Sequence, residues 1–257
     1  LSEKAYQGLV EPFDRSAYNL NATVGENLLF GTPVGDAFDL DRLPESPYVM
    51  ETLGKVGLVE EFLRVGHEVA ETMVELFAGL PPDHDYFAQF SFIGLDDLPD
   101  YQAILRKVER DGLDKLDETD RALLQALPFK ISPVRHRLGL IDDALQARIL
   151  EARALFAEHL PEELHGAVEF YDLDRYNAAS SLQDNLLFGK LVYGRAQAQA
   201  KVGELMSEVI ETLGLRSTVV EVGLDFEVGI GGARLSPAQR QKASIARAVL
   251  KRPAVMI

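Results

Sequence analysis

The chain has 257 residues, 47% of them apolar and 26% charged, a composition typical of a globular protein with a buried core. It has no cysteine, which excludes a disulfide framework and any thiolate-held metal or iron–sulfur site. The net charge of −15 argues against a nucleic-acid partner, because a phosphate backbone would be repelled. No apolar run reaches the ~20 residues of a membrane-spanning helix. The chain starts without methionine or a signal-peptide core, so we expect a fragment of a longer protein.

The spacing of apolar residues predicts a mainly α fold with few short strands. The predicted helices span residues 49–64, 67–78, 100–110, 117–127, 141–159, 195–213 and 238–251. Asp117 and Asp142 are the expected N-caps of two of them. The prolines expected to mark connections are Pro81, Pro82, Pro99, Pro128 and Pro161. The predicted strands are residues 168–171 and 254–257.

The sequence repeats itself in two blocks. Residues 18–31 recur as 176–189, and each copy follows an Asp-Arg pair, at 14–15 and 174–175. Farther along, Glu-Thr-Leu-Gly at 51–54 recurs at 211–214. Two blocks in the same order predict a duplication, although shared helix-start chemistry is an alternative. We therefore divide the chain into a first copy (1–66), an intervening helical block (67–169) and a second copy (170–257).

The residues around Ser236 predict a helix that starts with free backbone donors. Ser236 is a good N-cap, Pro237 suits the first helical position, and Gln239 completes a capping box with Ser236. The positive end of such a helix attracts anions. On this helix Arg240 and Arg247 fall on one basic face with Lys251. Taken alone, the capping box indicates no more than a well-capped surface helix with a basic face.

A wider pattern surrounds this helix start. Leu-Ser-x-x-Gln-Arg-Gln-Lys at 235–242 is followed by Ile-Ala-Arg-Ala-Val-Leu at 245–250, then by Arg-Pro and an apolar run. This resembles the signature helix of ATP-binding cassette (ABC) ATPases, whose motif is usually LSGGQ-x-Q-[RK]. Asp-Asn-Leu-Leu-Phe-Gly at 184–189 is similar to the family segment E-N-[IL]-x-[FY]-G that follows the Q-loop. The order and spacing of the two motifs match the family's helical subdomain.

The resemblance implies a bundle-like helical subdomain of an ABC ATPase, enlarged by a helical insertion. It implies that Ser236, Ala238, Gln239 and Arg240 contact ATP held in trans by a second ABC half or subunit. For the intact parent it implies ATP and Mg as cofactors and a transmembrane partner. It also implies a cytoplasmic location at the inner face of a membrane and a role in transport.

The departures from the family pattern limit what the chain does alone. Pro237 and Ala238 replace the two signature glycines, and no G-x-x-x-x-G-K-[ST] occurs. The chain stops at Ile257, about where the Walker B carboxylates are expected. We therefore assign it no catalytic residue and no metal site, and expect neither tight ATP binding nor hydrolysis by this chain.

Two alternatives to an ATPase piece stay open. One is a degenerate, non-hydrolysing ABC-like scaffold, which Pro237 favours, and the other is an unrelated helical interaction domain. We expect the block 67–169 to dock a partner or the second ATPase half through its polar exterior. Its aromatic side chains, expected mostly in the core, are Phe77, Tyr86, Phe87, Phe90 and Phe92.

Overall fold

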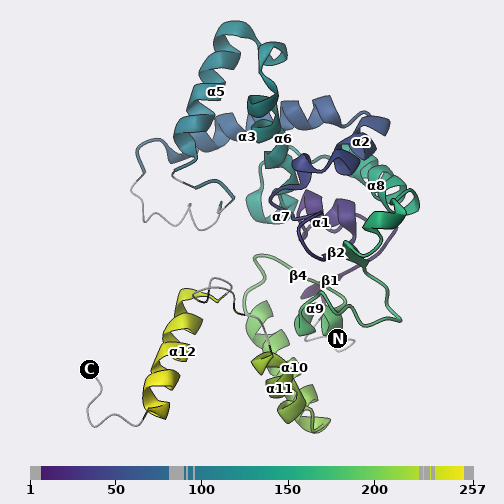
Figure 1. Ribbon diagram of the computed structural model, residues 1–257, viewed down its shortest axis with the longest axis vertical. Helices are drawn as coiled ribbons and strands as arrows, with labels where there is room; N and C mark the ends of the chain where they lie inside the picture. Colours follow the sequence, from purple (N-terminus) through teal and green to yellow (C-terminus); the bar gives the residue numbers. More distant parts are fainter. Residues whose placement is uncertain are drawn as a thin grey trace. The chain divides into compact units, whose positions relative to one another are not determined.

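The computed structural model describes residues 7–80, 90, 92–94, 96–225, 228, 232 and 235–251. The chain folds mainly into α-helices with a few three-residue strands, as the apolar spacing predicts (Figure 1). It divides into two compact units, Leu1–Val202 and Gly203–Ile257. Each unit is described by itself below.

The first unit contains four strands and most of the helices. The strands are β1 (Val10–Pro12), β2 (Gly31–Pro33), β3 (Val168–Phe170) and β4 (Gly189–Leu191). The helices are α1 (Val24–Leu29), α2 (Pro47–Lys55), α3 (Val59–Phe77), α5 (Leu98–Asp111), α6 (Glu118–Phe129), α7 (Pro133–His136), α8 (Asp143–Glu158) and α9 (Leu182–Leu187). Helix α10 (Ala198–Thr212) begins in this unit, and its start is buried through Ala198 and Val202.

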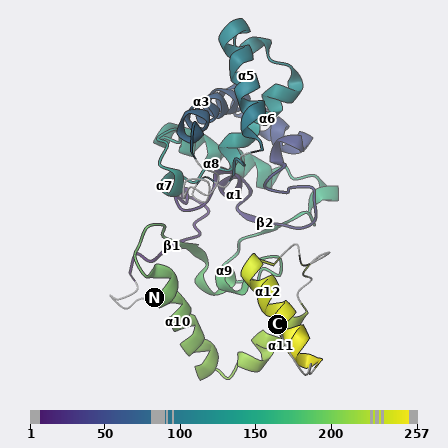
Figure 2. The same cartoon turned by 90° about the vertical axis from the view of Figure 1, so that its left-hand side faces the viewer.

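The core of the first unit lies where long helices cross. Helix α3 packs against both α5 and α6, and α1 packs between α6 and α8 (Figure 2). Phe62 of α3 meets Phe129 of α6 edge-on, with the ring centroids 5.0 Å apart. Phe38 and Phe156 make a second edge-on pair, also at 5.0 Å, beside α8. All four rings are almost completely buried, so they anchor the helices that surround α1.

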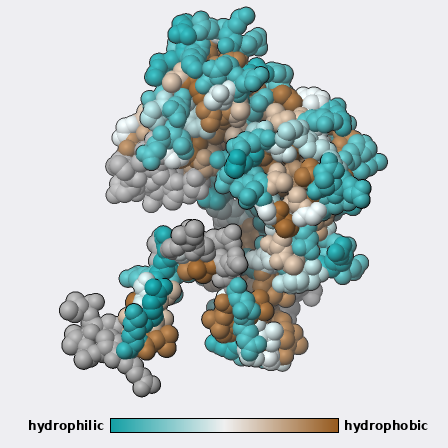
Figure 3. Space-filling model, viewed as in Figure 1, coloured by the Kyte–Doolittle hydropathy of each residue, from teal (hydrophilic) through white to brown (hydrophobic). Residues whose placement is uncertain are grey.

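The second unit consists of the rest of α10, α11 (Arg216–Leu224) and α12 (Pro237–Leu250). Its described helices bury little, and Figure 3 shows apolar side chains at the surface of α10 and α11. Large apolar side chains that are exposed on these two helices include Val209, Val220, Val222 and Leu224.

Two helix boundaries differ from the sequence prediction. The predicted helix 49–64 is interrupted, because Gly57 adopts a positive φ of 67° and ends α2. The N–H groups of Gly57 and Leu58 bond to the carbonyls of Gly54 and Leu53, which is a Schellman motif. Conversely, the break predicted after residue 64 is wrong: α3 runs on to Phe77, and its buried face continues through that point.

The predicted caps are confirmed, whereas one proline behaves differently. Asp117 accepts a hydrogen bond from the Asp120 N–H at 2.9 Å, and Asp142 accepts one from the Leu145 N–H at 2.8 Å. Pro128 does not separate elements but lies inside the last turn of α6. A proline there removes the N–H that would bond to the carbonyl four residues earlier.

The predicted core position of the aromatic stretch is confirmed where the structure describes it. Phe77 and Phe90 are buried, and Phe92 packs against the same core. Tyr86 and Phe87 lie outside the described residues, as does the strand predicted at 254–257. The other predicted strand, at 168–171, is β3.

The two sequence copies exchange strands. β1, which precedes the repeated block 18–31, pairs antiparallel with β4, which starts at the end of the repeated block 176–189. β2, at the end of the first block, pairs in the reciprocal way with β3, which precedes the second. Such reciprocal pairing is the signature of a twofold relation, here within one chain. Phe13 and Tyr171 occupy equivalent places next to β1 and β3, and their rings stack at 4.0 Å with 6° between planes.

Equivalent hydrogen bonds hold the two copies in the same conformation. Asn27 Oδ1 accepts from the Asn19 N–H at 2.9 Å, and Asn185 Oδ1 accepts from the Asn177 N–H at 2.8 Å. Phe30 and Phe188 end α1 and α9 in the left-handed region, at φ 45° and 44°. Shared helix-start chemistry does not account for bonds that match beyond the caps, so we interpret the repeat as a duplication.

The structure corrects the register of two sequence matches. Asp172, not Asp174, is equivalent to Asp14: each accepts a bond from the N–H two residues ahead, at 2.8 and 3.0 Å. The second echo also shifts, because the Schellman glycine Gly57 corresponds to Gly214. The Leu215 N–H bonds to the Ile210 carbonyl, as that of Leu58 does to Leu53. The paired Glu-Thr-Leu-Gly strings are therefore not equivalent positions.

His136, at the end of α7, is buried in its neutral form and predicts a pH dependence of stability. Its Nδ1 accepts the Ser132 N–H at 3.0 Å, and burial, followed by the charge of Arg135, lowers its pKa to about 4. The unfolded chain takes up this proton first as the pH falls below the ordinary value near 6.5. We expect the stability from neutral His136 to be lost between pH 6.5 and 4, up to about 3 kcal/mol.

Urea denaturation of the chain and of His136→Gln at several pH values checks this. The stability difference between the two should shrink toward pH 4, and a difference independent of pH would contradict it.

Candidate functional site

The start of α12 is the capping box that the sequence predicts. Ser236 is extended (φ −61°, ψ 158°), and its Oγ accepts the Gln239 N–H at 3.2 Å. The Gln239 Oε1 in turn accepts the Ser236 N–H at 2.8 Å. Ser236, Ala238, Gln239 and Arg240 are all exposed, so the structure leaves the helix start open to a ligand.

The capping box reduces the number of donors that are free for an anion. Pro237 has no N–H, and the N–H of Gln239 is already used by Ser236. Among the described residues, the N–H of Ala238 has no acceptor. The donors available to a bound phosphate are therefore this N–H and the Ser236 hydroxyl, one backbone donor fewer than the sequence suggests.

Basic residues extend along α12 from this point. Arg240 lies beside Gly232, where an added Cβ would come within 3.3 Å of the arginine stem. In the described part of the chain, Arg240, Lys242, Arg247 and Lys251 form no ion pair, and all are exposed. The other two basic residues of this stretch, Arg234 and Arg252, lie outside the described residues. The start of α12 is thus a positively charged end with uncommitted side chains.

The second motif, residues 184–189, forms the turn from α9 into β4. Ser181 caps α9 by accepting the Asp184 N–H at 3.1 Å, and Phe188 ends it in the left-handed region. Gly189 then enters β4 so close to β1 that a Cβ would lie 2.4 Å from the Glu11 carbonyl oxygen. This contact explains why glycine follows phenylalanine in both copies, because Gly31 meets the Glu169 carbonyl in the same way, at 2.7 Å.

Sequence reasoning missed a resemblance of α12 to α8, a helix of the intervening block. Both helices begin at a residue whose side chain accepts the N–H three positions ahead, Asp142 and Ser236. Counted from these caps, Arg153 and Arg247 hold the same position, each within Ala-Arg-Ala. That tripeptide occurs only at these two places in the sequence and is the signal that could have revealed the match.

Arg153 is a buried cation bound to oxygen atoms of the first copy. It is 3% exposed, and its Nε donates to the Asn27 carbonyl at 2.6 Å, while Nη2 donates to Asn27 Oδ1 at 2.9 Å. Nη1 donates to the carbonyls of Asp14, Arg15 and Ala17 at 3.0 to 3.3 Å. Burial lowers the pKa of Arg153 to about 10, which leaves it charged at neutral pH.

Comparisons with known proteins do not assign the chain to a family. No protein-family model matches the chain, and neither a curated protein nor a solved structure does. In the part of the chain that the structure describes, no cluster of three or more His, Cys, Asp or Glu side chains is arranged to hold a metal. Over the same residues, none of the helices has the length and apolar character needed to cross a membrane.

Proposed function

We propose that the chain is the helical, signature-bearing part of an ABC-type ATPase. In this proposal Ser236 and the Ala238 N–H contact the γ-phosphate of an ATP that a second ABC half or subunit holds with its P-loop. Arg240 adds positive charge at the same end, and Gln239 fixes the cap that orients Ser236. Mg and the ATP-gripping residues come from the intact parent, which works with a transmembrane partner at the inner face of a membrane.

The observation that carries the proposal is the exposed capping box at the start of α12. A helix start that is buried against its own chain could not meet a ligand held by another subunit, whereas Ser236 and Ala238 are exposed. The helix dipole and the charge of Arg240 favour an anion there. The Leu-Ser-x-x-Gln pattern joins this geometry to the ABC family, where such a contact is made in trans.

The two copies are not equal in this role. In α8, which packs over the first copy, Asp142 takes the capping position of Ser236, and a carboxylate would repel a phosphate at that helix start. The proposal therefore assigns one phosphate-binding helix start to the chain, at α12. Pro237, which removes a backbone donor, favours the alternative of a non-hydrolysing ABC-like scaffold.

Replacing Ser236 by alanine in the intact parent tests the proposal. The change removes a cap worth about 1 kcal/mol and a donor to the γ-phosphate. Loss of one such positioned donor lowers turnover on the order of 10²-fold, more than the lost cap explains. We expect this loss in steady-state ATPase rates at saturating ATP, with the protein still folded by circular dichroism.

Ser244→Ala is the matched control, because Ser244 is an exposed serine on the same helix, away from its start. We expect that variant to hydrolyse ATP at the normal rate. Normal turnover in Ser236→Ala would reduce Ser236 to a structural cap and favour the scaffold.

A second prediction concerns the chain alone. With no P-loop lysine in its sequence, it has no group to organise Mg-ATP for in-line attack. We expect no ATPase activity above background and no heat of ATP binding in titration calorimetry. Sustained turnover by the purified chain, after contaminating P-loop ATPases have been excluded, would contradict the proposal that the ATP-gripping residues come from the intact parent.

A further inference from the structure

Helix α9 has the same local structure as α1, but among the described residues of the first unit no helix covers it as α8 covers α1. Val24 and Leu28 of α1 are 0% and 1% exposed, whereas the equivalent Leu182 and Leu186 of α9 are 37% and 47% exposed. The difference arises because α8 packs over α1. The exposed apolar face of α9 is thus equivalent to a face of α1 that is buried under α8.

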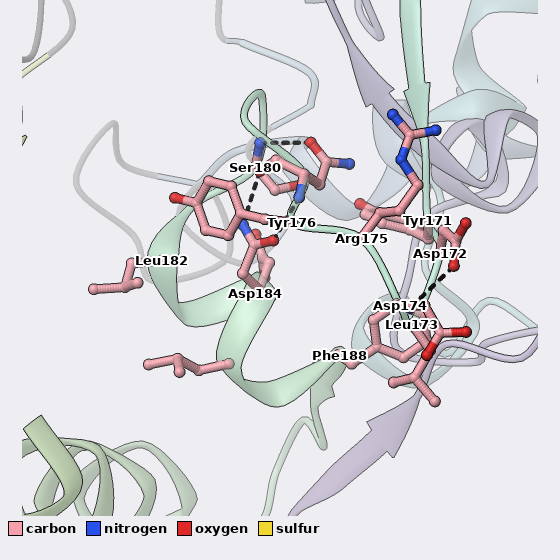
Figure 4. A pocket seen from close by; sticks show the side chains of 13 residues that line it. Tyr171, Asp172, Leu173, Asp174, Arg175, Tyr176, Ser180, Leu182, Asp184 and Phe188 are labelled. Carbon is pink, nitrogen blue, oxygen red and sulfur yellow. Dashed lines mark hydrogen bonds between the residues drawn. The ribbon is translucent and has the colours of Figure 1, made fainter. Parts of the chain in front are cut away.

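The cavity beside α9 has the lining that holds Arg153 in the first copy. It measures about 240 Å³ and lies between α9 and the loop that follows β3 (Figure 4). Arg153 contacts Asp14, Arg15, Ala17, Asn27 and Phe30. The residues equivalent to these five are Asp172, Leu173, Arg175, Asn185 and Phe188, and all five line the cavity.

The acceptors of this cavity suit a guanidinium group. Asn185 Oδ1 accepts the Asn177 N–H, as Asn27 Oδ1 accepts that of Asn19, and keeps a second lone pair for a further donor. In the first copy that second lone pair takes Nη2 of Arg153. Three carboxylates, of Asp172, Asp174 and Asp184, line the cavity against one cation, Arg175, so its lining is net negative and favours a cation. A lysine, with three donors on one atom, cannot reach acceptors spread over loop and helix as arginine's planar fork does.

We propose that this cavity is the docking site of an arginine-bearing helix with the pattern of α8, Ala-Arg-Ala followed by large apolar residues. The guanidinium would bond to the Asn185 side chain and to the loop carbonyls, over the Phe188 ring. The apolar residues after it would cover Leu182 and Leu186, as Phe156 lies buried after Arg153. The proposal rests on the equivalence of the two copies and does not depend on ATP binding.

The sequence itself supplies a probe of this class. Residues 246–250, Ala-Arg-Ala-Val-Leu, match the Ala-Arg-Ala-Leu-Phe of α8, and Arg247 is exposed. A labelled peptide of residues 236–251 therefore presents the proposed pattern. The receptor is the full chain with Arg247→Ala, so that it offers no competing arginine of its own, and fluorescence anisotropy measures binding.

We expect saturable binding of this peptide. The same peptide with Arg247→Ala should bind at least about tenfold more weakly, because it loses the charge-assisted hydrogen bonds of the guanidinium. The additional receptor change Leu186→Glu should abolish binding. Leu123→Glu, at a comparably exposed leucine of α6, should leave it unchanged. Circular dichroism confirms that each receptor is folded.

Three results would overturn the proposal: no saturable binding, equal affinity of the Arg247→Ala peptide, or binding that Leu123→Glu weakens as much as Leu186→Glu. None of them bears on the Ser236 proposal, whose test is the ATPase rate.

Discussion

Replacing Gly66 by alanine is expected to destabilise the first unit by about 4 kcal/mol or more. Gly66 lies in α3 where it crosses α6, and an added Cβ would lie 1.9 Å from the Leu124 carbonyl oxygen. The obstacle is backbone, which cannot rotate away as a side chain can, so α3 and α6 would have to separate. That separation would loosen the packing of Phe62 on Phe129, whose centroids are 5.0 Å apart.

Pro128 explains why the helices approach so closely at this point. Its missing N–H is the one that would bond to Leu124, four residues earlier in α6. The Leu124 carbonyl is therefore free to lie against α3, and only glycine there leaves room for it. Urea denaturation followed by circular dichroism measures the effect of Gly66→Ala.

Gly54→Ala is the control, because Gly54 is also helical and its Cβ would meet nothing within 4 Å. Alanine should stabilise α2 there by about 0.5 kcal/mol or more, through its better helix propensity. If both variants lost stability equally, glycine flexibility rather than the helix crossing would explain the first result.

The sequence was a good guide to the longer helices and a poor one to strands, crossings and the shorter helices α1, α7, α9 and α11, which were not predicted. Helical periodicity and caps are local, so Asp117 and Asp142 could be recognised as N-caps. Gly57 lies within an unbroken apolar pattern, and only its positive φ, which the sequence does not display, ends α2 there. The crossing at Gly66 joins residues far apart in sequence and has no local signal.

The repeat was visible, but its architecture was not. A three-residue strand such as β1 or β4 has too little periodicity to predict a partner, and the exchange between copies depends on pairing across most of the first unit. The identical tetrapeptides also predicted the wrong register between the copies, because two segments can share a backbone conformation without sharing residues. Gly57 and Gly214 share a Schellman motif although the matching Glu-Thr-Leu-Gly strings lie elsewhere.

The sequence predicted the capping box of α12 but did not reveal the similar helix α8. Ser236, Pro237 and Gln239 form a local motif, and the structure confirms the capping box. In α8 the serine has become Asp142, and the glutamine position is leucine, so the signature pattern has gone. What remains is Arg153, and its importance appears only from the carbonyl groups that the fold gathers around it.

Replacing Arg153 by methionine is expected to cost about 3–5 kcal/mol, because a buried hydrogen-bonding group loses its partner. Methionine matches the length and fills the space, but it leaves the carbonyls of Asp14, Arg15, Ala17 and Asn27 without their shared donor. The cation over the Phe30 ring, 4.7 Å from its centroid, is lost as well. Arg153→Lys keeps the charge but not the planar guanidinium, so the stability of that variant should fall between those of the unchanged chain and Arg153→Met.

Arg106→Met is the matched control for this change, since Arg106 is exposed on α5 and should tolerate it within about 0.5 kcal/mol. Thermal and urea denaturation of the four proteins at pH 7 give the comparison. Amide hydrogen exchange adds a local test: in Arg153→Met, protection should fall first in α1, which α8 covers, and not in α5. Equal stability of Arg153→Met and the unchanged chain would mean that these carbonyls find water instead. The cover of α1 by α8 would then rest on its apolar contacts alone.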